Sequence, residues 1–145
     1  MFREIRRVRQ RGPFERHRWF QDGYFDLFLA QNFLGRTQWF QLCYRRDTPR
    51  ERVLEWKRGR GFVHLQVTQP RHAADGQAGE LVADGAMPHH DVLRRFEAAA
   101  SGLPPEIAAF VVAKVHEHER PSSRFRRKGL LRPRWLQRLR AGAPL

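Results

Sequence analysis

The sequence predicts an α+β fold: an antiparallel β-meander of four to six strands, with two helices packed on one face and a basic C-terminal extension. Four β-type segments, rich in aromatic and β-branched residues, follow one another at residues 24–29, 37–45, 52–57 and 62–68. The gaps between them are short and hold turn-forming residues, whereas a parallel connection needs a dozen or more residues. Neighbouring strands must therefore run antiparallel, and the helices follow the sheet in the chain.

Two shorter segments extend the predicted sheet. The turn residues 21–23 indicate that Trp19 and Phe20 pair with the strand that follows, which would add an edge strand. Residues 80–84 are expected to form a last short strand. The stretch 69–79 between them has two glycines, one proline and no periodicity, which is typical of a surface loop.

Two helices are predicted at 91–100 and 105–118. Asp91 is a suitable N-cap for the first helix, and Gly102 is placed to end it. Prolines 104 and 105 favour the start of the second. Apolar residues recur at helical spacing in both segments: Val92, Leu93 and Phe96, then Ile107, Phe110, Val111 and Val115.

Alternation of side chains divides each strand into two faces. Alternate residues of each strand share a face, and one set of alternate residues is almost entirely apolar and is expected to form the core face: Phe25, Leu27, Leu29, Phe40, Leu42, Tyr44, Leu54, Trp56, Val63, Leu65 and Val67. The helices are expected to pack on this face. The second face mixes aromatic with ionisable groups: Tyr24, Asp26, Phe28, Trp39, Gln41, Cys43, Val53, Glu55, Lys57, Phe62, His64 and Gln66.

The length of 145 residues predicts one domain, able to bury about 68–70% of its unfolded surface. Charge divides the chain into three parts. A basic N-terminal arm at 1–18 has seven Arg and two Glu, and the α+β domain at 19–118 has twelve basic and twelve acidic residues. A basic tail at 119–145, with a short helix expected at 133–140, has nine basic residues and one acidic residue.

The formal charge of +13 suggests a polyanion partner, but 25 of the 28 basic residues are Arg, a bias that GC-rich coding also produces.

A single cysteine permits no intramolecular disulfide. The N-terminus has no apolar signal region, and no window reaches the roughly 18 apolar residues of a membrane span. A cytoplasmic protein with no transmembrane segment is expected.

The second face suggests a ligand pocket in which polar groups are framed by aromatic rings. Its candidate residues are Tyr24, Asp26, Trp39, Gln41, Glu55, His64 and Gln66. The alternative, which the sequence favours, is a set of solvated positions with cross-strand pairs. The aromatic residues of this face would form a large patch, so we expect a cover: the N-terminal arm, the 133–140 segment, a ligand, or a second chain in a homodimer.

No catalytic motif is recognised, and no catalytic residue, cofactor or metal is predicted. Cys43 could form a thiolate site with His64, Asp26 and Glu55, but a mid-strand cysteine is more often a small buried hydrophobe. A metal site is not expected at His116 and His118, because residues i and i+2 of a helix point about 200° apart, or at His89 and His90, because they precede the Asp91 cap on exposed chain. All four histidines are expected to be solvated.

Two functions remain open. The first is a non-enzymatic protein whose basic arms contact nucleic acid or an anionic surface, and the second is a small-molecule-binding protein or enzyme that uses the second face. The polyanion-binding candidates lie in the tail: Arg124, Arg126, Arg127, Lys128, Arg132, Arg134, Arg138 and Arg140. The Arg-Gly-Arg-Gly segment 58–61 is either an RNA-contacting repeat or a hairpin turn, and the turn is favoured.

The blocks at 22–28 and 40–44 resemble a family of small bacterial proteins with no known activity. The resemblance extends over about residues 11–115. It rests on strand-type blocks and transfers no catalytic residues.

Overall fold

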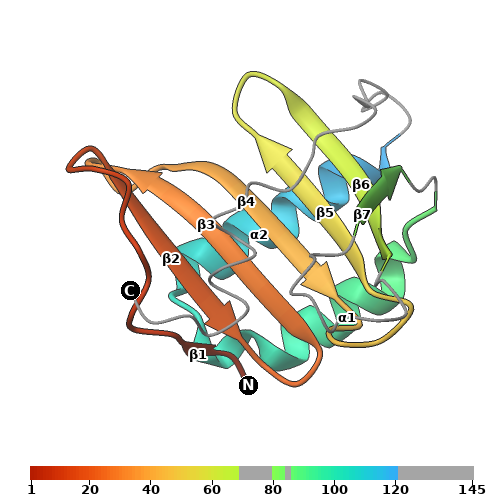
Figure 1. Cartoon of the computed structure of the whole chain (residues 1–145). Coiled ribbons are helices and arrows are strands. Elements are labelled where there is room, and N and C mark those ends of the chain that lie inside the picture. The colour runs from red at the N-terminus through yellow and green to blue at the C-terminus, as the bar shows by residue number, and fades with distance from the viewer. Residues whose placement is uncertain (69–79, 84–85, 121–145) are drawn as a thin grey trace, which may run out of the picture.

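The computed structural model describes residues 1–68, 80–83 and 86–120, and it has an α+β fold in which one antiparallel sheet carries two helices on one face (Figure 1). The seven strands pair in chain order: β1 (Arg3–Glu4), β2 (Glu15–Gln21), β3 (Phe25–Asn32), β4 (Thr37–Tyr44), β5 (Arg52–Lys57), β6 (Gly61–Thr68) and β7 (Glu80–Ala83). The helices are α1 (His89–Ala99), the short 3-10 helix η2 (Ala100–Gly102) and α2 (Pro105–Glu119).

The predicted fold class is confirmed. The sheet has one strand more than the upper limit predicted, because the two-residue β1 pairs with the end of β2. Helix α1 begins two residues before the predicted start, and α2 matches the prediction to within one residue. The predicted loop 69–79 and the predicted helix 133–140 lie outside the described residues.

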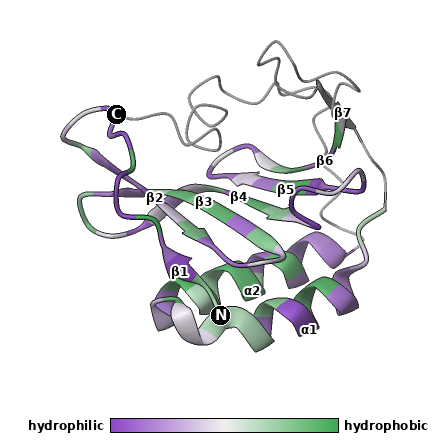
Figure 2. Cartoon of the chain, turned by 60° about the horizontal axis from the view of Figure 1, so that its bottom comes forward, coloured by the Kyte–Doolittle hydropathy of each residue, from purple (hydrophilic) through white to green (hydrophobic). Residues whose placement is uncertain are grey.

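The main core lies between the sheet and the helices (Figure 2). Helix α1 buries the stripe Val92, Leu93 and Phe96 that its sequence periodicity predicts. On the sheet, Leu42 and Leu54 are cross-strand partners and are both fully buried. Close packing of such side chains is the main stabilising contribution that the helices make to the sheet.

Strand β6 presents its side chains to the faces opposite to those predicted. The register pairs Leu54 with His64 and Val53 with Leu65, so Leu65 lies on the face away from the helices. The assignment of Val63, Leu65 and Val67 to the helix face is therefore wrong, and so is that of Phe62 and His64 to the second face. The β5–β6 turn decides this: Lys57 pairs with Gly61 across three residues, and both Gly59 and Gly61 have positive φ (79° and 83°).

The second face carries an apolar cluster of its own. Its buried members are Trp19, Phe28, Ala30, Trp39, Cys43, Val53, Val63, Leu65 and Val67. Two residues from the connection between β1 and β2, Ile5 and Val8, are partly buried against this cluster. Part of the N-terminal segment therefore packs over the aromatic residues of the second face, and such a cover was one of the alternatives that the sequence predicts.

The first residues of the chain belong to the main core. Phe2 is 2% exposed, stacks on Phe25 with ring centroids 5.7 Å apart, and contacts Phe96 at 5.5 Å. Its backbone N–H donates to the carbonyl of Ala99 at 3.1 Å. The segment predicted as an N-terminal arm therefore starts inside the domain, and its basic residues are held along the sheet edge.

Candidate nucleic-acid interface

The structure divides the predicted ligand-pocket residues between the two faces. Asp26, Trp39, Gln41 and Glu55 share the second face, as the alternation predicts. His64 and Gln66 lie on the helix side of β6, and the Tyr44 hydroxyl is 2.7 Å from the His64 Nε2. Tyr24 packs beside the main core, with the Arg95 guanidinium 4.6 Å above its ring. The seven predicted residues are not brought together.

The polar groups that remain on the second face are buried and hydrogen-bonded, although the side-chain oxygen of Gln41 has no hydrogen-bond partner among the described residues. The Asp26 carboxylate accepts hydrogen bonds from the Trp19 indole N–H at 2.8 Å and the Gln21 amide at 2.9 Å. The amide of Gln41 donates to the Glu55 carboxylate. The alternative that the sequence favoured over an open pocket was a set of solvated positions with cross-strand pairs. The structure has such cross-strand pairs, but the side chains that make them are buried, so the expected solvation is wrong.

The thiolate hypothesis fails on geometry. Cys43 is a fully buried cysteine, not part of a disulfide, within the apolar cluster of the second face. His64 faces the helices because of the β6 register, so the sheet separates the thiol from the imidazole. Cys43 behaves as a small hydrophobe, which was the interpretation favoured from the sequence.

The expectation that the four helix histidines are solvated is wrong for His118. Its side chain is 3% exposed, and its Nδ1 is 2.8 Å from the Nε2 of half-buried His89. The sequence signal for the burial of His118 was its place in a helical series: Ile107, Val111, Val115 and His118 are four, four and three residues apart, so they lie on one side of α2. Within the described ranges, no group of three or more His, Cys, Asp or Glu residues could hold a metal ion.

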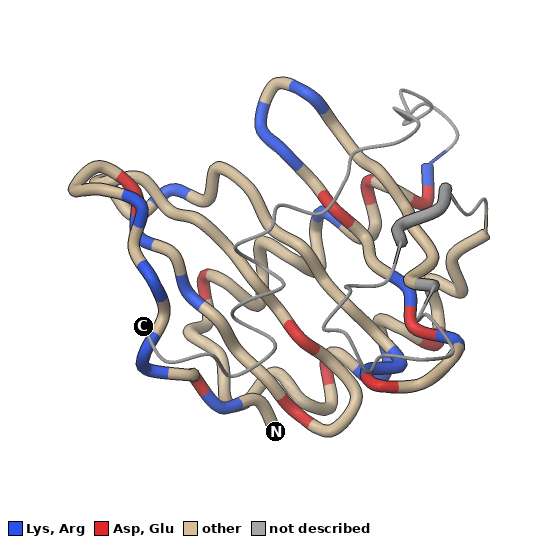
Figure 3. The backbone as a smooth tube through the Cα atoms, in the orientation of Figure 1, with Lys and Arg blue, Asp and Glu red and all other residues tan. Residues whose placement is uncertain are grey.

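One end of the sheet is distinctly basic (Figure 3). Strand β2 begins there, β3 ends and β4 begins there, and β5 turns into β6 there. The turns at this end, 11–14, 33–36 and 58–60, hold four Arg and no Asp or Glu. We call these three turns with the adjoining Glu15, Arg16 and Lys57 the basic end.

The opposite end of the sheet has no such excess. Its described turns, 22–24 and 45–51, hold three Arg and three acidic residues. Several of these charges are engaged locally: Arg46 donates to the Asp47 carboxylate at 2.8 Å and to the carbonyl of Asp22 at 3.0 Å. The described turns at the two ends of the sheet therefore differ in net charge, four Arg without an acidic residue at one end against three Arg and three acidic residues at the other.

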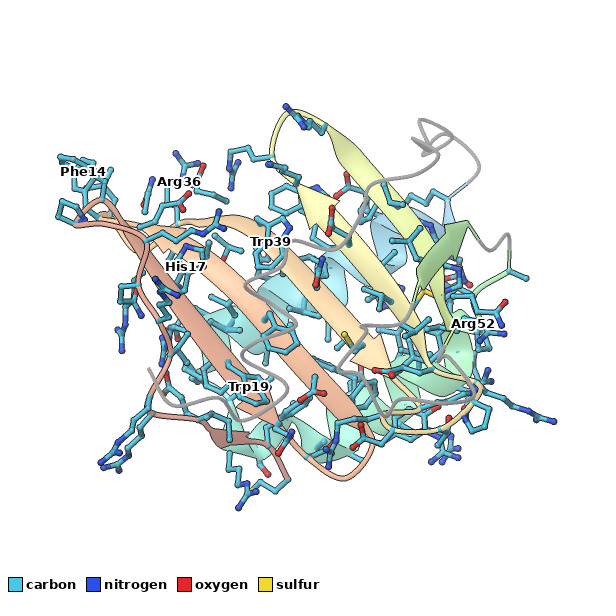
Figure 4. The ribbon with its side chains drawn as sticks, viewed as in Figure 1. Phe14, His17, Trp19, Arg36, Trp39 and Arg52 are labelled. Atoms are coloured by element: carbon cyan, nitrogen blue, oxygen red, sulfur yellow. The ribbon has the colours of Figure 1, made fainter. Side chains whose placement is uncertain are left out.

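Large apolar side chains are exposed at the same basic end. Phe14, Phe33 and Leu34 are 75%, 79% and 69% exposed, and all three lie in its turns. Figure 4 shows Phe14 and Arg36 at one corner of the sheet, away from Trp19 and Trp39 on the second face. Exposed aromatic rings beside arginines are the combination that nucleic-acid-binding surfaces use.

Local hydrogen bonds fix the shape of the β3–β4 turn. The Asn32 side-chain oxygen accepts from the backbone N–H groups of Leu34 and Arg36, both at 3.0 Å. Gly35 adopts φ 78°, a conformation that glycine accepts without strain. This turn therefore presents Phe33, Leu34 and Arg36 outward from a defined backbone.

Two hollows border the basic end. One, of about 400 Å³, lies between the turn before β2 and the β3–β4 turn, with Phe14, Phe33 and Glu15 in its lining. The other, of about 300 Å³, lies between the β3–β4 turn and the start of α2. Arg58 lines the second hollow, and its guanidinium donates to the carbonyl of Thr37 at 2.8 Å and lies 5.3 Å from the Trp56 ring centroid.

Sequence reasoning placed the polyanion-binding residues in the tail, which lies outside the described residues. At 58–61 the sequence favoured a hairpin turn over an RNA-contacting repeat, and the structure confirms a turn at 58–60, whereas the neighbouring turns were not predicted to take part. A signal was present: Phe33 and Leu34 stand next to the turn-forming Gly35, where polar residues are usual.

No family model, curated protein or solved structure matches the chain in the comparisons with known proteins. Among the described helices, none is long and apolar enough to cross a membrane.

Proposed function

We propose that this protein is a non-enzymatic nucleic-acid-binding protein that contacts the phosphate backbone through the basic end and the basic C-terminal tail. The observation that carries the proposal is the segregation of charge: four Arg and no acidic residue in the turns at one sheet end, against three of each at the other. A phosphate backbone attracts such an edge regardless of base sequence.

Two guanidinium groups of the basic end are available for this role. Arg36 and Arg60 are exposed, and the side chains of both make no hydrogen bond or ion pair within the described part of the chain. Arginine presents five donors in a planar fork that matches phosphate oxygens. The turns of the two ends hold similar numbers of Arg, so the net charge of the basic end comes from the absence of acidic residues in its turns, which an Arg-rich coding bias does not explain.

The test is a salt titration of oligonucleotide binding with a matched pair of variants. Arg36→Gln/Arg60→Gln removes two charges from the basic end. Arg50→Gln/Arg94→Gln removes the same charge elsewhere, since Arg50 is exposed at the opposite end and Arg94 pairs with Asp91 on α1. Two lost phosphate contacts should make the slope of log affinity against log salt shallower by about 1.8 for duplex DNA, whereas the control should not change it.

The tail is tested in the full-length chain by changing its eight candidate basic residues to Gln. If six to eight arginines each contact a phosphate, the wild-type slope for duplex DNA should be about −5 to −7, and the tail variant should lose more than half of it. Scrambled sequences should bind equally, because phosphate contacts carry no base information. Equal effects of the two double variants, or no binding at about 50 mM salt, would contradict the proposal.

A further inference from the structure

We infer that the hollow between Phe14 and Phe33 binds a nucleobase, which would make single-stranded nucleic acid the preferred ligand of the basic end. The inference rests on the proposed function and adds the class of nucleic acid to it. Both rings line the hollow, and both are at least 75% exposed, although phenylalanine is usually buried.

The dimensions and location of the hollow suit a base with its phosphate. Its volume of about 400 Å³ lies within the range of small-ligand sites. Arg16 is part of the lining, and Arg36 follows Phe33 in the same turn, so a base held at the rings would have guanidinium groups close to its phosphate. A duplex keeps its bases stacked inside and offers no free ring face to Phe14 or Phe33.

The polar lining favours a base over a lipid chain or a bare phosphate. Glu15 and Asn32 line the hollow beside the two rings. A carboxylate repels phosphate but accepts a hydrogen bond from a base amino group, such as N4 of cytosine. An acyl chain would form no hydrogen bond with the same carboxylate, which already pairs with His17 at 3.2 Å, and would displace water from it.

The experiment compares binding of an oligodeoxycytidylate, of a duplex, and of vesicles of phosphatidylcholine with phosphatidylserine. Phe14→Ala/Phe33→Ala removes both rings, Phe14→Leu/Phe33→Leu keeps apolar bulk without an aromatic face, and Leu34→Ala removes an exposed apolar side chain that does not line the hollow. All three side chains are exposed, so the variants should fold normally.

Both Phe double variants should bind the single strand at least about fivefold more weakly, since stacking contributes about 1–3 kcal/mol per base. Leu34→Ala should bind it normally. Duplex binding should be unchanged in all variants, and the salt slope should stay the same because no charge is removed.

Three results would overturn the inference. One is full single-strand affinity in the Ala variant, and another is retention of affinity by the Leu variant alone, which would indicate apolar contact without stacking. The third is vesicle binding that the Ala variant weakens while oligonucleotide binding stays unchanged. If Arg36→Gln/Arg60→Gln still makes the salt slope shallower, only the nucleobase site fails; if no oligonucleotide binds the wild-type chain, the proposed function itself fails.

Discussion

The assignment of faces in the sheet can be tested with alanine substitutions at three fully buried leucines. Leu42 and Leu54 are cross-strand partners on the helix face, whereas Leu65 lies on the opposite face beside Val53. Each Leu→Ala change removes three carbon atoms, about 2.4 kcal/mol of transfer free energy at roughly 0.8 kcal/mol each. The cavity left behind raises the expected loss of unfolding free energy to about 2–5 kcal/mol per site.

The two faces can be distinguished by whether the loss of unfolding free energy in a double variant equals the sum of the losses in its two single variants. Leu42→Ala and Leu54→Ala share a cavity, so their double variant should depart from additivity by about 0.5–3 kcal/mol. Leu54→Ala and Leu65→Ala point to opposite faces and should be additive to within about 0.5 kcal/mol. If Leu65 lay on the helix face, as the apolar pattern of the sequence suggested, this second pair would be coupled like the first.

The measurement is urea unfolding of the wild type, the three single variants and the two double variants. A fixed concentration of trimethylamine N-oxide keeps the double variants folded without altering the comparison. Leu34→Ala, at an exposed turn position, is the control and should stay within about 0.5 kcal/mol of the wild type. Strong coupling between Leu54 and Leu65, or losses below about 1 kcal/mol at the buried sites, would refute the reasoning.

Two further predictions concern the stability of the domain. Gly102→Ala should destabilise it, because a Cβ there would overlap the backbone carbonyl of Phe2, whereas Gly23→Ala meets no atom within 4 Å; equal midpoints of thermal unfolding would argue against this close approach. Burial lowers the pKa of His17 below the ordinary 6.5, although the neighbouring Glu15 opposes the effect. The unfolded chain then takes up the proton first as the pH falls, so the unfolding free energy should be greatest above about pH 6.5 and should decline as the pH falls below it. In chemical denaturation across this range, His17→Gln should decline less steeply than the wild type; parallel curves would contradict the assignment.

Local pattern in the sequence was sufficient for the fold class. Short gaps exclude parallel connections, and the residues of each strand and helix carry their own periodicity, so strand order and helix positions followed from chemistry close in the chain. The burial of Val92, Leu93 and Phe96 on one side of α1 is an example.

The candidate site could not be predicted in the same way, because its parts are distant in sequence. Phe14, Phe33 and Arg60 lie at the same end of the sheet only because the strands between them have nearly matched lengths and pair in register. The tail, with its denser charge, was the more obvious candidate in the sequence. An aromatic residue in a turn can be recognised as a candidate binding residue only when the fold shows that no described residue packs over its ring.

Strand β6 is the clearest example of a feature that could not be predicted from the sequence alone. Val63, Leu65 and Val67 are apolar, and so is Phe62 on the other parity, so alternation offered no decision between the two faces. The composition of each segment determined the strands, the helices and the concentration of charge. The conformation of a three-residue turn, with Gly59 and Gly61 at positive φ, fixed the register and thereby decided which side chains face the helices.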